Sequence, residues 1–310
     1  MLTPGLLGAT VAGFSCGLPV ALQPHTVTLP LPELPTHVVR RLDVPARKSY
    51  QPVPLVVIID DGPPVDPDRT HGQAGRIGQL HQIILREGYA VWRPLENAWP
   101  ADSVLVRCPD ELAAQVQLGL RSARELGVID SSRMVILGFG QGGVIGAVVA
   151  QRMSSDVCAL ALIGTPARSI DRILISSPLR DSVTKARMER IFDDLWAGLY
   201  PDTAAVLSGT AGCWRAWLSV SQQMPEIIQR LPQPVFAVQG TADKLLPMLD
   251  IERFRRAIEG RPFSWTENAV GMKHDLSDEV PDPKQPPGSI SPRFVPLLMK
   301  WLTAVAPLAE

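Results

Sequence analysis

The chain has 310 residues, with 30 lysines and arginines against 31 aspartates and glutamates, so its formal net charge is -1. This balance excludes an overall basic field for nucleic acid, and it excludes a strongly acidic chain. Hydrophobic residues make up 45% of the chain and charged residues 20%, which is typical of a folded globular protein. The length allows one large α/β domain or two smaller ones.

The four cysteines are widely scattered and form no C-x-x-C pair; they are Cys16, Cys108, Cys158 and Cys213. We therefore expect no zinc site and no disulfide framework. Cys158 lies within an apolar run and is expected to be a small core residue.

Membrane and targeting signals are weak. No uninterrupted apolar run reaches the length of about 18 residues that a membrane-spanning helix needs, so no membrane span is predicted. The first 22 residues are apolar but contain no Lys or Arg. We expect them to form a strand and a turn in a cytoplasmic protein, with an exported protein as the alternative.

From residue 53 onwards, short apolar runs alternate with segments of helical periodicity. The runs predict strands at 53–59, 89–92, 133–137, 157–163, 234–239 and 262–266. The periodic segments predict helices at 73–87, 109–126, 142–153, 247–258 and 292–305. Continuous apolar strands separated by helices indicate a mostly parallel central sheet flanked by helices on both faces.

One segment, 166–230, interrupts this alternation. It reads as mostly helical, has no clear strand and contains Trp196, Trp214 and Trp217. We expect it to form a helical cap over the carboxyl edge of the sheet. Its tryptophans would either line an apolar ligand space or fill a core. The predicted organisation is then N-terminal strands and an extension at 1–52, a core at 53–165 and 231–310, and the cap at 166–230.

The segment 134–144 reads as a strand, a tight turn and a helix. Its small residues at 138, 142 and 143 are what a nucleophile elbow needs, because neighbouring backbone passes too close for a Cβ. A glycine turn that binds phosphate and a plain packing turn are the alternatives. The run lacks the dinucleotide-binding spacing, and no Lys-Ser/Thr pair follows it. We therefore expect no nucleotide or flavin cofactor.

Two further residues fit an acid–base pair. Asp243 comes just after the strand at 234–239, and His274 lies about thirty residues further along the chain. The carboxyl ends of parallel strands share one edge of the sheet, so the carboxylate and the imidazole are expected to meet there. Alone, Asp243 would more often cap a helix, and His274 would more often be an ordinary loop histidine.

Together these segments resemble the α/β-hydrolase superfamily, specifically its capped bacterial serine esterases. The resemblance covers about 53–305. It rests on the elbow Gly-Phe-Gly-Gln-Gly at 138–142, on Gln-Gly-Thr-Ala-Asp at 239–243 and on Gly-Met-Lys-His at 271–274. The order elbow, acid, base is the order of this superfamily. The resemblance implies an α/β-hydrolase fold with a helical cap insertion.

Two departures from the superfamily pattern bear on function. The serine position of the Gly-x-Ser-x-Gly elbow is Gly140, which has no hydroxyl and forms no acyl-enzyme. The oxyanion loop, where relatives carry His-Gly, begins with Asp60 and Asp61. The backbone N–H groups of Gly62 and Gln141 would still form an oxyanion hole, although carboxylates beside it disfavour a developing negative charge.

Three functions fit this pattern. The first is a degenerate hydrolase that binds a small or medium apolar carbonyl or acyl compound and moves protons on it with the His274–Asp243 dyad, in a cyclisation, elimination or addition. Asp60 or Asp61 would supply a second titratable group. The second is a carboxylic ester hydrolase carrying an inactivating Ser→Gly replacement. The third is a pseudohydrolase that binds its ligand without chemistry.

Overall fold

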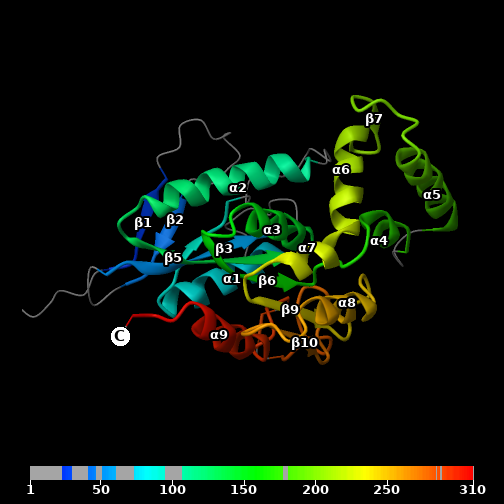
Figure 1. The fold of residues 1–310 in the computed structure, drawn as a ribbon. Helices are drawn as coiled ribbons and strands as arrows, with labels where there is room; N and C mark the ends of the chain where they lie inside the picture. Colours follow the sequence, from blue (N-terminus) through cyan, green and yellow to red (C-terminus); the bar gives the residue numbers. More distant parts are fainter. Residues whose placement is uncertain are drawn as a thin grey trace, which may run out of the picture.

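A computed structural model of the chain describes residues 23–29, 41–46, 51–60, 73–94, 107–176, 181–283, 285–286 and 288–309. Its centre is a sheet of eight described strands in the order β1-β2-β4-β3-β5-β6-β9-β10 (Figure 1). The strands are β1 (His25–Thr28), β2 (Arg41–Val44), β3 (Val53–Ile59), β4 (Ala90–Trp92), β5 (Ile129–Phe139), β6 (Val157–Ile163), β9 (Val235–Gly240) and β10 (Trp265–Ala269). β2 runs antiparallel to β1 and β4, and the other neighbours pair in parallel. The predicted mostly parallel sheet is thus confirmed.

Helices cover both faces of this sheet, as predicted. They are α1 (Gln73–Arg86), α2 (Pro109–Arg124), α3 (Gln141–Arg152), α8 (Leu249–Ala257) and α9 (Phe294–Val305). α2 and α3 lie on one face, and α1 and α9 lie on the other (Figure 1).

The side chains of β3 show why its apolar run is continuous. Leu55 and Val57 belong to the core that contains α2 and α3 residues. Val56 and Ile58 belong to the core that contains α1 and α9 residues. Because successive strand residues point to opposite faces, a strand buried on both faces is apolar at every position.

The segment 166–230, here called the insertion, lies between β6 and β9. It contains α4 (Ile170–Ser176), α5 (Ser182–Trp196), β7 (Ala205–Val206), β8 (Gly209–Thr210), α6 (Ala211–Gln222) and α7 (Met224–Arg230). α5, α6 and β7 stand out to one side of the sheet (Figure 1). The short antiparallel pair of β7 with β8 corrects the expectation that this segment has no strand.

Two of the three tryptophans of the insertion, Trp214 and Trp217, belong to the core that also contains α2 and α3 residues. Trp214 and Trp217 are buried, and the Trp214 ring meets Phe192 edge-on at a centroid distance of 5.6 Å. The indole N–H of Trp214 donates to the Val206 carbonyl at 3.0 Å, and that of Trp217 donates to the Arg107 carbonyl at 2.7 Å. Trp196 is partly exposed and donates to Asp171. Of the two expectations for these residues, core packing describes Trp214 and Trp217.

The expectation of no disulfide is wrong. Cys108, at the N-cap of α2, is bonded to Cys213 in the first turn of α6, and the two Cα atoms lie 4.7 Å apart. The cysteines are 105 positions apart in sequence, so their spacing carries no signal. Packing of the insertion against the core brings them together. Cys158 is a free cysteine in β6, and its burial raises the pKa of its thiol to about 12.

The last strand is Trp265–Ala269 rather than 262–266, because residues 261–264 form a turn closed by the Ser264 N–H on the Arg261 carbonyl. The expected N-terminal strand and turn within the first 22 residues lie outside the described residues. In the part of the chain that is described, no helix is both long and apolar enough to cross a membrane.

Candidate active site

The elbow between β5 and α3 has the predicted strand–turn–helix form. Gly140 occupies its apex with φ 51° and ψ -119°, a region that residues with side chains rarely adopt. Its N–H donates to the Ile163 carbonyl at 2.9 Å, and its own carbonyl accepts from the Gly143 N–H at 3.1 Å. The apex is therefore fixed by backbone hydrogen bonds to β6 and within the turn.

The other glycines of the elbow are required by close backbone approach. A Cβ on Gly138 would lie 2.4 Å from the Gly143 Cα, and one on Gly142 would lie 2.1 Å from the Ile59 carbonyl oxygen. A Cβ on Gly143 would lie 1.9 Å from Thr165 Oγ1. These contacts are far shorter than a Cβ tolerates, so the turn depends on glycine at all three positions.

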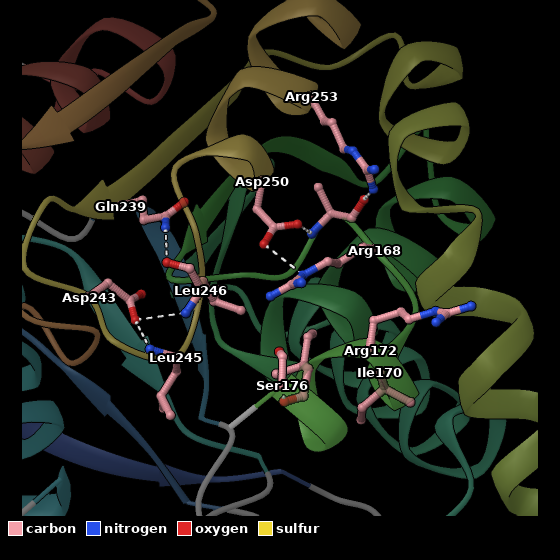
Figure 2. A network of polar contacts seen from close by, with 12 residues as sticks. Arg168, Ile170, Arg172, Ser176, Gln239, Asp243, Leu245, Leu246, Asp250 and Arg253 are labelled. Carbon is pink, nitrogen blue, oxygen red and sulfur yellow. Dashed lines mark hydrogen bonds and ion pairs between the residues drawn. The ribbon is translucent and has the colours of Figure 1, made fainter. Parts of the chain in front are cut away.

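Asp243 is held rigidly at the end of β9. Its Oδ1 accepts hydrogen bonds from the N–H groups of Leu245 at 2.7 Å and Leu246 at 2.9 Å (Figure 2). The buried amide of Gln239 donates to the Leu246 carbonyl at 2.8 Å and so supports the same loop. The Asp243 side chain is 0% exposed. One carboxylate oxygen is thereby committed to the loop, and Oδ2 remains for another partner.

That partner is His274, whose Nδ1 lies 2.8 Å from Asp243 Oδ2. A carboxylate only accepts hydrogen bonds, so Nδ1 carries the proton and donates it to Oδ2. In the neutral ring Nε2 is then the basic nitrogen. The imidazole is 25% exposed, so the dyad has one fully buried member and one member open to the surface of the site.

Two glycines let the histidine loop approach the sheet. Gly164, just after β6, has φ +54°, and a Cβ there would lie 3.3 Å from His274 Cε1 and 3.4 Å from Nδ1. A Cβ on Gly240 would lie 2.1 Å from the Met272 carbonyl oxygen. The imidazole therefore lies against the carboxyl end of β6, and the loop that carries it lies against the carboxyl end of β9.

A small pocket joins the elbow and the dyad. It is lined by Arg76, Ile77, Phe139, Gly140, Ile163, His274, Asp275 and Ile290. Its volume of about 10 Å³ is roughly the room that one water molecule needs. Gly140 and His274, predicted as partners from sequence, thus line one pocket.

Arg76 and Asp275 in this pocket were not predicted. Arg76 Nη2 lies 2.7 Å from Asp275 Oδ2, and Nη1 donates to the Gly288 carbonyl at 3.0 Å. Burial alone would raise the pKa of Asp275, but hydrogen bonds from Ser277 and the charge of Arg76 hold that pKa below its ordinary value. Arg76 therefore ties α1 to the loop that carries His274. The two partners are about 200 positions apart in sequence, and no motif connects them.

The remaining predicted site residues are only partly described. Asp60 follows β3, and its carbonyl oxygen would lie 3.1 Å from a Cβ on Gly142, so its backbone borders the elbow. Gln141 is the first residue of α3, where helix N–H groups point out of the helix end. Asp61 and Gly62 lie outside the described residues. The oxyanion hole therefore stays a prediction.

Among the described side chains, no three His, Cys, Asp or Glu residues gather in a way that could hold a metal ion.

Solved structures with the same architecture are esterases, lipases and related hydrolases. Est1E from Butyrivibrio proteoclasticus is 16% identical, with a TM-score of 0.53 over 76% of this chain and 86% of that one. A monoacylglycerol lipase from Paleococcus ferrophilus is 14% identical, with a TM-score of 0.54 over 83% and 97%. A meta-cleavage product hydrolase from Pseudomonas fluorescens IP01 is 16% identical, with a TM-score of 0.51 over 82% and 92%.

These similarities show that the chain has the α/β-hydrolase fold. At such low identity they show the fold alone. No protein-family model and no curated protein matches the sequence. The function therefore has to be argued from the site itself.

Proposed function

We propose that this protein binds a small or medium apolar carbonyl or acyl compound and moves protons on it without covalent catalysis. His274 Nε2 would take or give a proton at the bound compound, and Asp243 would hold the ring and stabilise the imidazolium that forms. The reaction would be a cyclisation, an elimination or an addition. Because the pocket at Gly140 and His274 has room for about one water molecule, the reacting carbonyl group would enter this pocket and the apolar chain of the compound would lie outside it, with the insertion as a cap.

One observation carries the proposal: the dyad is fully built beside an elbow that lacks its nucleophile. The 2.8 Å contact between His274 and Asp243, the two N–H groups on Asp243 and the Gly164 approach all preserve an oriented imidazole. Gly140 supplies no hydroxyl for this imidazole to activate. A preserved base without a nucleophile fits proton transfer to a bound compound better than acyl transfer.

An ester hydrolase with an inactivating replacement is the second candidate. It is favoured by the backbone of Gly140, whose φ 51° and ψ -119° hold the sharp apex of the elbow although the residue is glycine. Under this candidate, Gly140→Ser would restore a working triad. The third candidate, a binding pseudohydrolase, predicts that His274→Ala leaves ligand affinity within a few-fold.

The test is hydrolysis of short and medium p-nitrophenyl esters by the native chain and by Gly140→Ser. We expect no more than a trace rate from either protein, because Asp60 and Asp61 would place negative charge beside the oxyanion position. Rapid turnover by the serine variant, lost again in Gly140→Ser/His274→Ala, would contradict our proposal in favour of an inactivated esterase.

A further inference from the structure

We propose that Arg168 binds a carboxylate at the far end of the compound that His274 acts on. The inference rests on the proposed function and narrows its substrate class to an acyl or carbonyl compound with an apolar chain and one anionic end. Arg168 stands at the start of the insertion, five residues after the end of β6.

The position of Arg168 in the chain places it within reach of the dyad. Gly164 lies against the His274 ring, at the separations given above, and only four residues lead from Gly164 to Arg168. Four residues span at most about 14 Å. The distance between the imidazole and the guanidinium is therefore no more than the combined length of a medium-length acyl chain and the arginine side chain.

A buried carboxylate fixes the Arg168 side chain. Its Nε lies 3.2 Å from Oδ2 of Asp250, a residue on α8 whose side chain is 0% exposed. Oδ1 of Asp250 accepts the Ala167 N–H at 3.2 Å, and Arg253 donates to the Ala167 carbonyl at 3.0 Å (Figure 2). A charge buried this completely needs its partner. Asp250 therefore holds the guanidinium in place on its inward-facing side, at Nε.

The outer edge of this guanidinium remains available. Within the described part of the chain, no hydrogen bond or ion pair involves the two terminal nitrogens of Arg168, and its side chain is 19% exposed. In Figure 2 it passes below Asp250 towards the loop of Leu246, whereas the side chain of Arg172 points the opposite way. Leu245 and Leu246 belong to the loop that holds Asp243.

A carboxylate is the ligand that this geometry suits. The two terminal N–H groups of a guanidinium lie in one plane and match the two oxygens of a carboxylate. Asp250 occupies only the Nε side, and Arg253 adds a second positive charge nearby, because both arginines act on Asp250. A bound carboxylate would therefore meet directed donors that are already oriented.

The experiment compares monomethyl adipate with methyl hexanoate, two esters of similar length of which only the first carries a carboxylate. Binding is measured by NMR titration with native protein, Arg168→Gln and the matched control Arg172→Gln, an exposed arginine on the neighbouring helix α4. We expect native protein to bind monomethyl adipate about tenfold more tightly, the effect of a charge-assisted hydrogen bond. Arg168→Gln should abolish this preference, and Arg172→Gln should keep it.

A second variant protects the test against misfolding. Arg168→Gln leaves Asp250 buried without its partner, whereas Arg168→Gln/Asp250→Asn removes both charges and keeps an oxygen for the Ala167 N–H. The double variant should fold and should also lack the preference. Equal affinity of native protein for the two probes, or a preference that survives in the double variant, would overturn the inference. Because the readout is binding, it is independent of whether His274 performs proton transfer.

Discussion

At the scale of single residues, Gly140 and Gly164 show how the site is shaped by backbone rather than by side chains. Gly140 adopts φ 51° and ψ -119°, a conformation that would cost a residue with a side chain about 1–3 kcal/mol. Gly164, with φ +54°, allows the His274 ring to lie directly against the end of β6. The first glycine holds the apex of the elbow without a hydroxyl, and the second leaves room for the imidazole.

Replacing Gly164 with alanine should displace His274. The new Cβ would lie 2.9 Å from the His274 carbonyl oxygen and within 3.4 Å of Nδ1, so the backbone of His274 must shift and the contact of its ring with Asp243 is disturbed. The positive φ adds a cost of about 1–2 kcal/mol. We expect the downfield proton signal of Nδ1–H in the NMR spectrum to shift or disappear.

Gly198→Ala is the control for this substitution. Gly198 has φ +70° but no atom within 4 Å of a Cβ, so it carries a similar backbone cost without touching the dyad. In Gly198→Ala, the Nδ1–H signal of His274 should remain unchanged. An unchanged signal in Gly164→Ala as well would show that the ring position does not depend on this contact.

At the scale of elements, two links fasten α6 of the insertion to the start of α2. One is the disulfide Cys108–Cys213, and the other is the hydrogen bond from Trp217 to the Arg107 carbonyl. We therefore expect α6 to stay attached to α2 under oxidising conditions, where disulfides persist.

Removing this disulfide should loosen the insertion and lower the free energy of unfolding by about 2–5 kcal/mol. The measurement is urea unfolding of the native chain and of Cys108→Ser/Cys213→Ser, with peptide mapping after alkylation. We expect a linked Cys108–Cys213 peptide and an unmodified Cys158, because the Cys158 thiol has a pKa of about 12. Alkylation of Cys108 and Cys213 in native protein folded under oxidising conditions would contradict the link.

At the scale of the whole molecule, the features predicted from sequence are those with a local signal. The continuous apolar runs indicated β3 and β6, and the glycines of 138–143 indicated the elbow. The order of Gly140, Asp243 and His274 was enough to expect a dyad, since parallel strands share one carboxyl edge.

The features that sequence did not predict join residues that are far apart in the chain. Arg76 with Asp275 and Arg168 with Asp250 are contacts between separate elements, and neither pair has a characteristic spacing. The same holds for the disulfide. The tryptophans of the insertion gave an ambiguous signal because a large aromatic side chain suits a ligand pocket and a core equally well.

The most direct test of the central claim is exchange of the α-protons of carbonyl compounds in D₂O, followed by NMR. Acetophenone, cyclohexanone and methyl acetoacetate are incubated with native protein, His274→Ala and the control His25→Ala, which changes an exposed histidine of β1. If His274 moves protons without a nucleophile, native protein and His25→Ala should catalyse the exchange. His274→Ala should not catalyse it. Equal exchange rates for native protein and His274→Ala with all three compounds would contradict the proposed acid–base function.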